Sequence, residues 1–229
     1  QTWGIYSVAG PQTPVRQMAL NMGAPGDRRA DDGILWLSWP RPWSRMQLQP
    51  DLTVAFREDG GYFSDDTRLT EVEGADVPWL YSSGVRGLQR LAIPLVRRGD
   101  IPAAYSVRLH LLAGDEAEPL AAFDITLQGE TVAEAVEMPV TEGGVSQPVI
   151  RELGPVPVQG ELEVALVSRD AEATAGSLPV VCAIELKRVP LPGMDATLQT
   201  PEAPLERYNL GYWLADTLRG AAGADLPKG

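Results

Sequence analysis

Cysteine, histidine and long apolar runs are nearly absent from this sequence. Cys182 is the only cysteine among 229 residues, so no disulfide can form within the chain and paired-cysteine metal sites are excluded. His110 is the only histidine, which excludes zinc sites built from several histidines of one chain. No apolar run approaches the roughly eighteen residues of a membrane-spanning helix. We therefore expect no membrane span, no metal centre and no cofactor.

Basic residues are also few. The 19 lysines and arginines face 31 aspartates and glutamates, giving a net charge of −12 and an isoelectric point near 4.5. Nucleic-acid binding depends on Lys and Arg that neutralise phosphates, so we expect no nucleic-acid partner. An anionic lipid surface is equally unfavourable. Neutral glycans, cations and basic proteins remain as partners.

The composition is that of an ordinary globular protein, with 44% hydrophobic and 22% charged residues. No signal peptide is visible, and the chain begins at Gln1 rather than at a methionine. Such a start is typical of a processed mature protein or of a fragment. We expect an export signal to have been removed and the protein to work outside the cytoplasm, in the periplasm, on the cell surface or as a secreted protein.

Catalytic patterns are absent as well. There is no Gly-x-Ser-x-Gly turn, and His110 lies on the polar face of a predicted strand, where we expect an ordinary surface histidine. Carboxylate pairs of the glycosidase type arise everywhere among so many acids, and none can be singled out. The acidic loop at residues 27–33 does not match a calcium-binding EF-hand loop. We therefore expect a protein that is not an enzyme.

Alternating apolar and polar residues dominate the second half of the chain. In residues 105–111 every odd position is apolar, a period of two that is typical of a half-buried antiparallel strand. Turn residues separate such segments, and none has the pattern of a long helix. We predict an all-β fold, an antiparallel β-sandwich of the jelly-roll type. The strands predicted here are residues 105–111, 123–127, 162–166 and 180–186.

The first half of the chain carries weaker strand signals. We predict a strand at residues 15–21, another near 48–56, and a return to the core at 88–95, where Pro94 indicates a strand end or an edge strand. Residues 57–78 have the composition of a long acidic loop with a weak strand inside it. Cys182 is expected to be a small buried residue of a core strand.

The order of these segments resembles the malectin-like family. The resemblance rests on a Tyr-x-Val-x-Leu strand at 105–111, an acidic loop, Phe-Asp-Ile-x-Leu-x-Gly at 123–129, and a closing strand at 179–184. Upstream, residues 20–23 and 32–36 resemble the opening strands of that family. The resemblance covers about residues 15–189. It implies a β-sandwich lectin domain that typically has no catalytic activity.

The sugar-binding residues of the family do not carry over well. Its loop aromatic pair would fall near Asp115 and Glu116, and its ligand-binding acid would fall at Ser177. Only an upstream aromatic residue has a loose counterpart, at Trp36. The resemblance therefore implies the scaffold, and the diglucose specificity of animal malectin is not expected.

Aromatic residues near loops are the alternative glycan-binding candidates. Sugars stack their C–H faces on exposed rings while polar groups bind the hydroxyls, so a lectin needs both kinds of residue together. The same rings could instead close the ends of the sandwich. The residues that we expect to bind a glycan are Trp36, Tyr62, Phe63, Trp79 and Tyr81 for stacking, with Asp66 and Arg86 for the hydroxyls.

Proline-rich stretches suggest how the chain is divided. Residues 1–14 read as an N-terminal arm, 15–189 as the sandwich domain, 190–206 as a Pro-rich linker, and 207–229 as a short amphipathic helix with a tail.

Two functional hypotheses remain open. The first is a noncatalytic binding module for a glycan or a protein partner. The alternative is an accessory or structural subunit of a larger envelope or extracellular complex, anchored through its terminal segments, which carry more apolar residues than free tails usually do. The residues expected to bind that partner are Trp3, Tyr6, Tyr208, Leu210, Trp213, Leu214 and Leu218.

Overall fold

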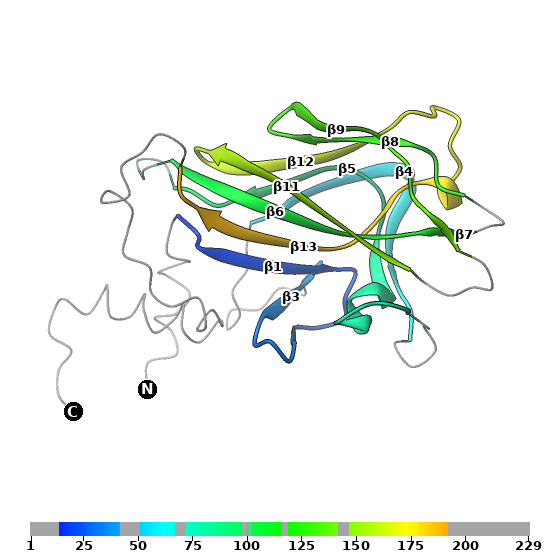
Figure 1. Ribbon diagram of the computed structural model, residues 1–229, viewed down its shortest axis with the longest axis horizontal. Helices are drawn as coiled ribbons and strands as arrows, with labels where there is room; N and C mark the ends of the chain where they lie inside the picture. The colour runs from blue at the N-terminus through cyan, green and yellow to red at the C-terminus, as the bar shows by residue number, and fades with distance from the viewer. Residues whose placement is uncertain are drawn as a thin grey trace, which may run out of the picture.

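The computed structural model describes residues 14–41, 51–66, 72–97, 100, 102–115, 119–141 and 147–191. These residues form two packed layers of β-strands with two short 3-10 segments (Figure 1). The predicted all-β sandwich is confirmed. The predicted arm, apart from Pro14, and the predicted linker and helix from residue 192 onward lie outside the described residues, and the proposed domain boundaries stay predictions.

Each layer is a run of neighbouring, hydrogen-bonded strands. The first layer has the spatial order β2 (Arg28–Arg29), β3 (Leu35–Trp39), β1 (Gln17–Met22), β13 (Val180–Val189), β6 (Ala103–Leu112) and β11 (Pro148–Val158). The second has the order β4 (Thr53–Ser64), β5 (Ser83–Pro94), β12 (Glu161–Ser168), β8 (Phe123–Leu127) and β9 (Glu130–Val136).

Strand β13 joins the two layers. It pairs with β6 along most of its length, while Val180 and Val181 also pair with Arg86 and Val85 of β5. Pairing between the described strands is antiparallel, with two exceptions: β1 runs parallel to β3, and the short strands β7 (Gly114–Asp115) and β10 (Val140–Thr141) run parallel to each other. The layers therefore form one continuous, mixed sheet that folds over on itself.

The main core lies between the layers, and the period of two predicts much of it. The odd positions of residues 105–111 are all fully buried, and the hydroxyl of Tyr105 donates to the carbonyl oxygen of Val15 at 2.7 Å. Burial of such apolar area is the main stabilising contribution in a sandwich of this size. The largest fully buried non-aromatic residues of the main core are Leu20, Met22, Leu88, Leu91, Ile93, Leu95, Leu109, Leu111 and Ile125.

All the strands predicted in the second half are present, but the longer strands β9 and β11 were missed, as were the two-residue strands β7 and β10. Strand β9 is a mostly exposed edge, so it has no apolar face that alternation can reveal. Strand β11 is interrupted by Gly154, Pro155 and Pro157, and the register with β6 shifts between Leu153 and Val156. An edge strand tolerates proline because one side of its backbone has no ladder partner.

The prediction for residues 57–78, a long acidic loop with a weak strand inside it, is wrong in placing a loop directly after residue 56. Strand β4 continues to Ser64 and pairs with β5, with register shifts on both sides of Phe56. The first shift leaves an extra residue, Gln89, on β5, and the second leaves extra residues on β4 between Phe56 and Gly61. Such irregularities break the alternation on which the prediction depended. Pro94 lies at the end of β5, one of the two positions that the sequence allowed.

The two ends of the sandwich differ. Strand β1 begins and β13 ends at one end, whereas the 3-10 segments η1 (Pro78–Ser82) and η2 (Ala175–Ser177) lie at the opposite end with β7 (Figure 1). Neither of these short helical segments in the described part of the chain has the length and apolarity of a membrane crossing.

Candidate functional site

The residues predicted to bind a glycan do not form one exposed aromatic surface. Trp36 on β3 and Tyr81 on η1 are each 3% exposed. Tyr62 and Phe63 on β4 are half-buried, and Tyr62 packs against the main core whereas Phe63 packs on the other side of the layer. For Trp36 and Tyr81 the prediction is wrong, because a buried ring offers no face to a sugar.

These rings belong to a second apolar cluster, which we call the outer cluster. It covers the face of the β3–β1–β13–β6 layer that points away from the main core, and η1 packs on it. Small side chains on β1 and β13 leave room for the large rings above them. Its buried members are Ala19, Ala30, Trp36, Leu80, Tyr81, Val180, Cys182 and Ala183.

His110 lies in this cluster and is 6% exposed, so its predicted surface position is wrong. The hydroxyl of Tyr81 lies 2.8 Å from Nδ1 of His110, and the Trp36 ring meets the imidazole edge to face with 5.3 Å between centroids. Burial, with a smaller contribution from Arg108, lowers the pKa of His110 to about 4. The imidazole is therefore neutral at pH 7.

The remaining predicted residues are partly covered or lie apart from the cluster. The guanidinium of Arg28 lies 4.6 Å from the centroid of the half-buried Trp79 ring. Arg86 lies over Phe63 at 5.9 Å and donates from Nη1 to the carbonyl oxygen of Gly176 at 3.0 Å. Asp66 is exposed just beyond the end of β4. Guanidinium groups thus occupy ring faces that a stacked sugar would need.

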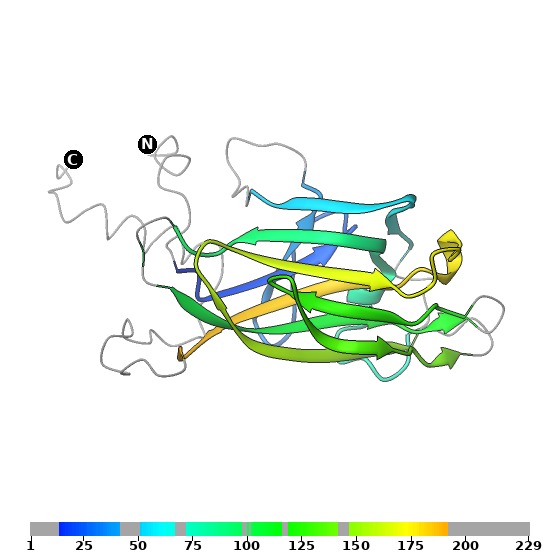
Figure 2. The same ribbon diagram turned by 90° about the horizontal axis from the view of Figure 1, so that it is seen from above.

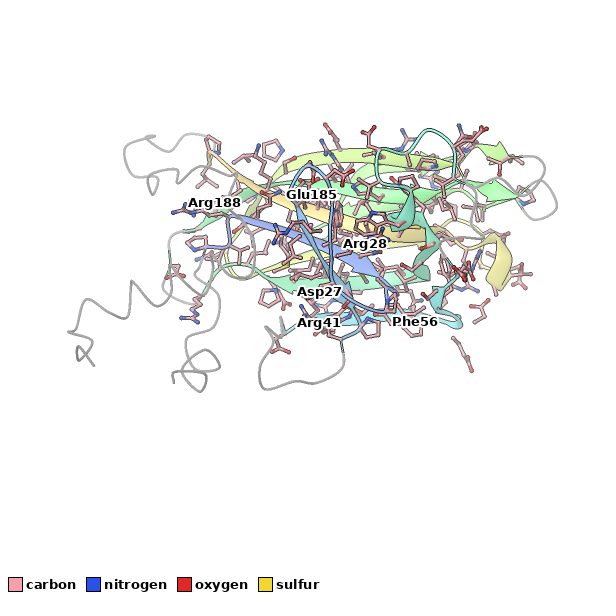
Figure 3. The ribbon with its side chains drawn as sticks, turned by 90° about the horizontal axis from the view of Figure 1, so that it is seen from below. Asp27, Arg28, Arg41, Phe56, Glu185 and Arg188 are labelled. Atoms are coloured by element: carbon pink, nitrogen blue, oxygen red, sulfur yellow. The ribbon has the colours of Figure 1, made fainter. Side chains whose placement is uncertain are left out.

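Two carboxylates of the acidic loop at residues 27–33 accept hydrogen bonds from residues that follow the loop. Oδ1 of Asp27 accepts from the backbone N and the hydroxyl of Ser38, and Oδ2 accepts from Arg41 at 2.7 Å (Figure 3). Oδ1 of Asp32 accepts from the backbone N of Ile34. Within the described ranges, no group of three or more His, Cys, Asp or Glu side chains is arranged to hold a metal ion.

A cleft opens on the outside of the second layer, and we call it the Arg57 cleft. Its volume is about 240 Å³, and a shallower hollow of about 420 Å³ adjoins it through Arg57 and Gln89. Strands β4, β5 and β12 supply the floor, and the β12–β13 loop supplies one wall. The residues that line the cleft are Arg57, Gly87, Gln89, Leu166, Val167, Ser168, Asp170, Ala171, Leu178 and Pro179, with Glu58 and Asp59 in the hollow.

Several hydrogen bonds fix the wall of the Arg57 cleft. Nη2 of Arg57 donates to the carbonyl oxygen of Ala173 at 3.1 Å. The backbone N of Gly87 donates to the carbonyl oxygen of Pro179 at 2.9 Å. Gly87 has φ +67°, and a Cβ there would come within 2.7 Å of Cδ1 of Leu178. Only glycine lets the wall approach β5 this closely, so the cleft is formed before any ligand arrives.

The cleft offers both polar and apolar contacts. Arg57 and Gln89 present planar groups that donate hydrogen bonds, Ser168 and Asp170 add oxygen atoms, and Val167, which is 50% exposed, supplies apolar surface. Nε of Arg57 lies 3.2 Å from Oδ1 of Asp59, which orients the guanidinium. This mixture fits a hydroxylated ligand.

Sequence analysis missed this site. Its residues come from positions 57–59, 87–89 and 166–179, which are distant in the chain, and no motif marks them. The sequence pattern predicts a loop for Arg57 and its acidic neighbours. The one usable signal was the pair Gly60 and Gly61, because glycines inside a strand often mark a bulge.

Comparison with known proteins gives a likeness of fold. No protein-family model matches the sequence, and no curated protein matches it. The ANXUR1 extracellular domain from Arabidopsis thaliana aligns with a TM-score of 0.50 and 10% identity, covering 76% of this chain and 42% of that one. A β-glucuronidase of Bacteroides uniformis gives 0.49 and 14%, with 76% and 18% covered. The plant receptor-like kinase FER gives 0.48 and 14%, with 76% and 42% covered.

This chain spans less than half the length of each of these structures. At such identities the comparison concerns architecture alone. The likeness to the ANXUR1 domain supports the fold that the order of strands predicts: the chain folds as a malectin-like β-sandwich.

Proposed function

We propose that this chain is a noncatalytic binding module that works outside the cytoplasm and holds a glycan in the Arg57 cleft. The observation that carries the proposal is the fixed wall of the cleft, which Arg57 and Gly87 hold against β4 and β5. A site formed in advance loses little conformational entropy when a ligand binds. The malectin-like fold is compatible with such a role but does not establish it.

The charged residues around the Arg57 cleft indicate which class of glycan it can bind. Arg57 is accompanied by Glu58, Asp59 and Asp170 in and beside the cleft, and the chain as a whole is acidic. An acidic sugar would meet repulsion there, whereas the hydroxyls of a neutral sugar can bind both the donors and the acceptors. The ligand that fits best is a neutral oligosaccharide.

Absence of catalysis is part of the proposal. His110 is buried against Tyr81 and Trp36, so the single histidine cannot reach a substrate in the Arg57 cleft. Binding then depends on hydrogen bonds and on the apolar floor.

The test is a glycan array of neutral and uronic oligosaccharides, followed by calorimetry with Gln89→Ala. Gln89 is exposed on β5, and losing its hydrogen bonds should weaken binding by about tenfold. The matched control is Gln147→Ala, an exposed glutamine at the start of the β11 region, which should bind like wild type.

A second variant distinguishes the cleft from the aromatic loop. Trp79→Ala should leave the affinity unchanged if the Arg57 cleft is the site. If Trp79→Ala abolishes binding and Gln89→Ala does not, the aromatic loop binds the glycan instead. If no oligosaccharide binds, the glycan proposal fails.

A second candidate function is that of an accessory subunit in an envelope or extracellular complex. Edge strands β9 and β11 run along the side of the sandwich away from β4 (Figure 2). Val132 on β9 is 43% exposed and Ile150 on β11 is 50% exposed. Exposed apolar side chains on unpaired strand edges are typical of surfaces that contact another protein.

Co-purification from the source tests this candidate. Ile150→Lys should remove protein partners, whereas Val167→Lys, which changes an equally exposed valine on the central strand β12, should retain them. Equal recovery of partners with both variants would exclude the β11 edge. The terminal residues predicted to bind a partner lie outside the described residues and remain a prediction.

A further inference from the structure

His110 occupies the contact between η1 and the first layer. It comes from β6, Tyr81 comes from η1, and Trp36 comes from β3, so three separate elements meet at the imidazole. The hydrogen bond between Tyr81 and His110 ties η1 to the sheet across 29 residues of sequence. Beneath η1, Cys182 on β13 is fully buried.

One nitrogen of the imidazole is buried without a partner. Nε2 of His110 finds no hydrogen-bond partner within the described part of the chain, and neither does Nε1 of Trp36 beside it. A neutral imidazole leaves one nitrogen unsatisfied here. A protonated imidazole would bury a charged N–H at Nε2, which is much more costly.

The ionisable groups around His110 do not compensate a positive charge. Arg108, two residues earlier on β6, is cationic, and it donates to Glu185 at 3.2 Å and to Glu152 at 2.6 Å, so both carboxylates are engaged. Tyr81 and Cys182 are neutral, because burial raises the pKa of both groups. Asp76, which precedes η1, is exposed and acts electrostatically on Tyr81.

We propose that the Tyr81–His110 contact is an acid-sensitive latch, in which protonation of His110 releases the η1 segment, residues 72–82, and uncovers Cys182. When the segment lifts, the imidazolium reaches water and its charge is solvated. The main core lies on the other face of the layer and stays closed. The inference does not depend on the proposed glycan function. The lowered pKa of His110, about 4, places the transition below neutral pH.

The reporter is Cys182, the single cysteine of the chain. Its reaction with dithiodipyridine, which remains reactive in acid, measures the population in which the outer cluster is open. Between pH 7 and about pH 4.5 the labelling rate should rise roughly 50-fold beyond that of an unfolded control, because the open state binds a proton at an ordinary histidine pKa.

Two variants test the chemistry of the latch. His110→Gln keeps a polar group but cannot be protonated, so its labelling rate should change less than about twofold over this range once corrected for the unfolded control. Tyr81→Phe removes the hydroxyl, and its labelling at pH 7 should be roughly fivefold faster than in wild type. An equal acid response in His110→Gln and wild type would overturn the proposal.

A third variant separates local from global opening. Val164 on β12 is fully buried in the main core, so Val164→Cys in a Cys182→Ala background reports unfolding of the whole sandwich. Acid favours the unfolded state as well as the open one, so labelling should rise at both sites, but at each pH Val164→Cys should react at least tenfold more slowly than Cys182, each relative to its unfolded control. Equal corrected rates at the two sites would refute a latch. If His110→Gln does not fold, NMR titration of the sole histidine in wild type tests the latch instead. The pH midpoint of the His110 chemical shift must coincide with the pH midpoint of Cys182 labelling, and separate midpoints would overturn the proposal.

Discussion

The phenol of Tyr81 and the imidazole of His110 are hydrogen-bonded at 2.8 Å beneath a surface that the sequence predicts to be solvent-exposed. The pair fixes η1 on the outer face of the first layer and closes the outer cluster. The glycine-dependent contact between Gly87 and Leu178 plays a similar part at the Arg57 cleft. Both contacts lead to measurable consequences.

Removing the Tyr81 hydroxyl should destabilise the domain moderately. Tyr81→Phe leaves the buried ring in place and leaves Nδ1 of His110 without its partner, which should lower the free energy of unfolding at pH 7 by about 1–2 kcal/mol. Urea denaturation followed by far-UV circular dichroism measures the change. A variant as stable as wild type would mean that the hydrogen bond makes no net contribution.

His110 should make stability fall in acid. Its pKa is lowered from 6.5 in the unfolded chain to about 4 in the fold, so the unfolded state binds a proton first as pH decreases. The stability that depends on a neutral His110 is fully present above about pH 6.5 and is lost progressively down to pH 4. It amounts to about 3 kcal/mol of the free energy of unfolding. Urea unfolding of wild type and His110→Gln at several pH values isolates it, because other titrating groups are common to both. Parallel pH profiles would contradict this assignment.

Gly87→Ala should damage both stability and the Arg57 cleft. A left-handed backbone and a Cβ 2.7 Å from Cδ1 of Leu178 together should cost about 2–4 kcal/mol. Gly129→Ala is the matched control, because Gly129 also has positive φ, +80°, but a Cβ added there would meet no atom within 4 Å. It should cost only about 1–2 kcal/mol. Thermal unfolding measures both, and equal losses would show that the Leu178 contact relaxes freely.

Ala135→Gly should stabilise the protein. Ala135 on β9 has φ +47°, a conformation in which its Cβ is strained, and its backbone N donates to Oδ1 of Asp124 at 2.7 Å. Glycine relieves the strain and keeps that bond, for a net gain of about 0.5–1 kcal/mol. Ala133→Gly on the same strand relieves no strain and should destabilise by a similar amount. A loss of stability in Ala135→Gly would show that the strain is smaller than the entropy cost of glycine.

The alternation of apolar residues was a sound guide wherever a strand has one face in the main core. Residues 105–111 and 123–127 form strands as predicted, and Cys182 is buried as predicted. Strands β4, β9 and β11 escaped prediction, in whole or in part, because bulges, prolines or exposed edges disturb the period of two. The pattern reports burial, and an edge strand buries little.

The candidate site was the weakest part of the prediction. Their place near loops predicts that Trp36 and Tyr81 can bind sugars, yet both are buried in the outer cluster. The period of two tells which face of a strand a residue occupies, and it cannot tell whether another segment covers that face. Here η1 covers it, and His110 changes from a surface residue into a buried one.

Composition and local pattern thus determined that this chain is an acidic, all-β sandwich without an internal disulfide, because those properties follow from residue counts and from neighbours in sequence. Tertiary structure alone decided the second buried face and the Arg57 cleft. Tyr81 and His110 lie 29 residues apart, and Arg57 and Ala173 lie 116 apart. Contacts over such separations depend on the register and packing of whole strands, which short-range periodicity does not encode.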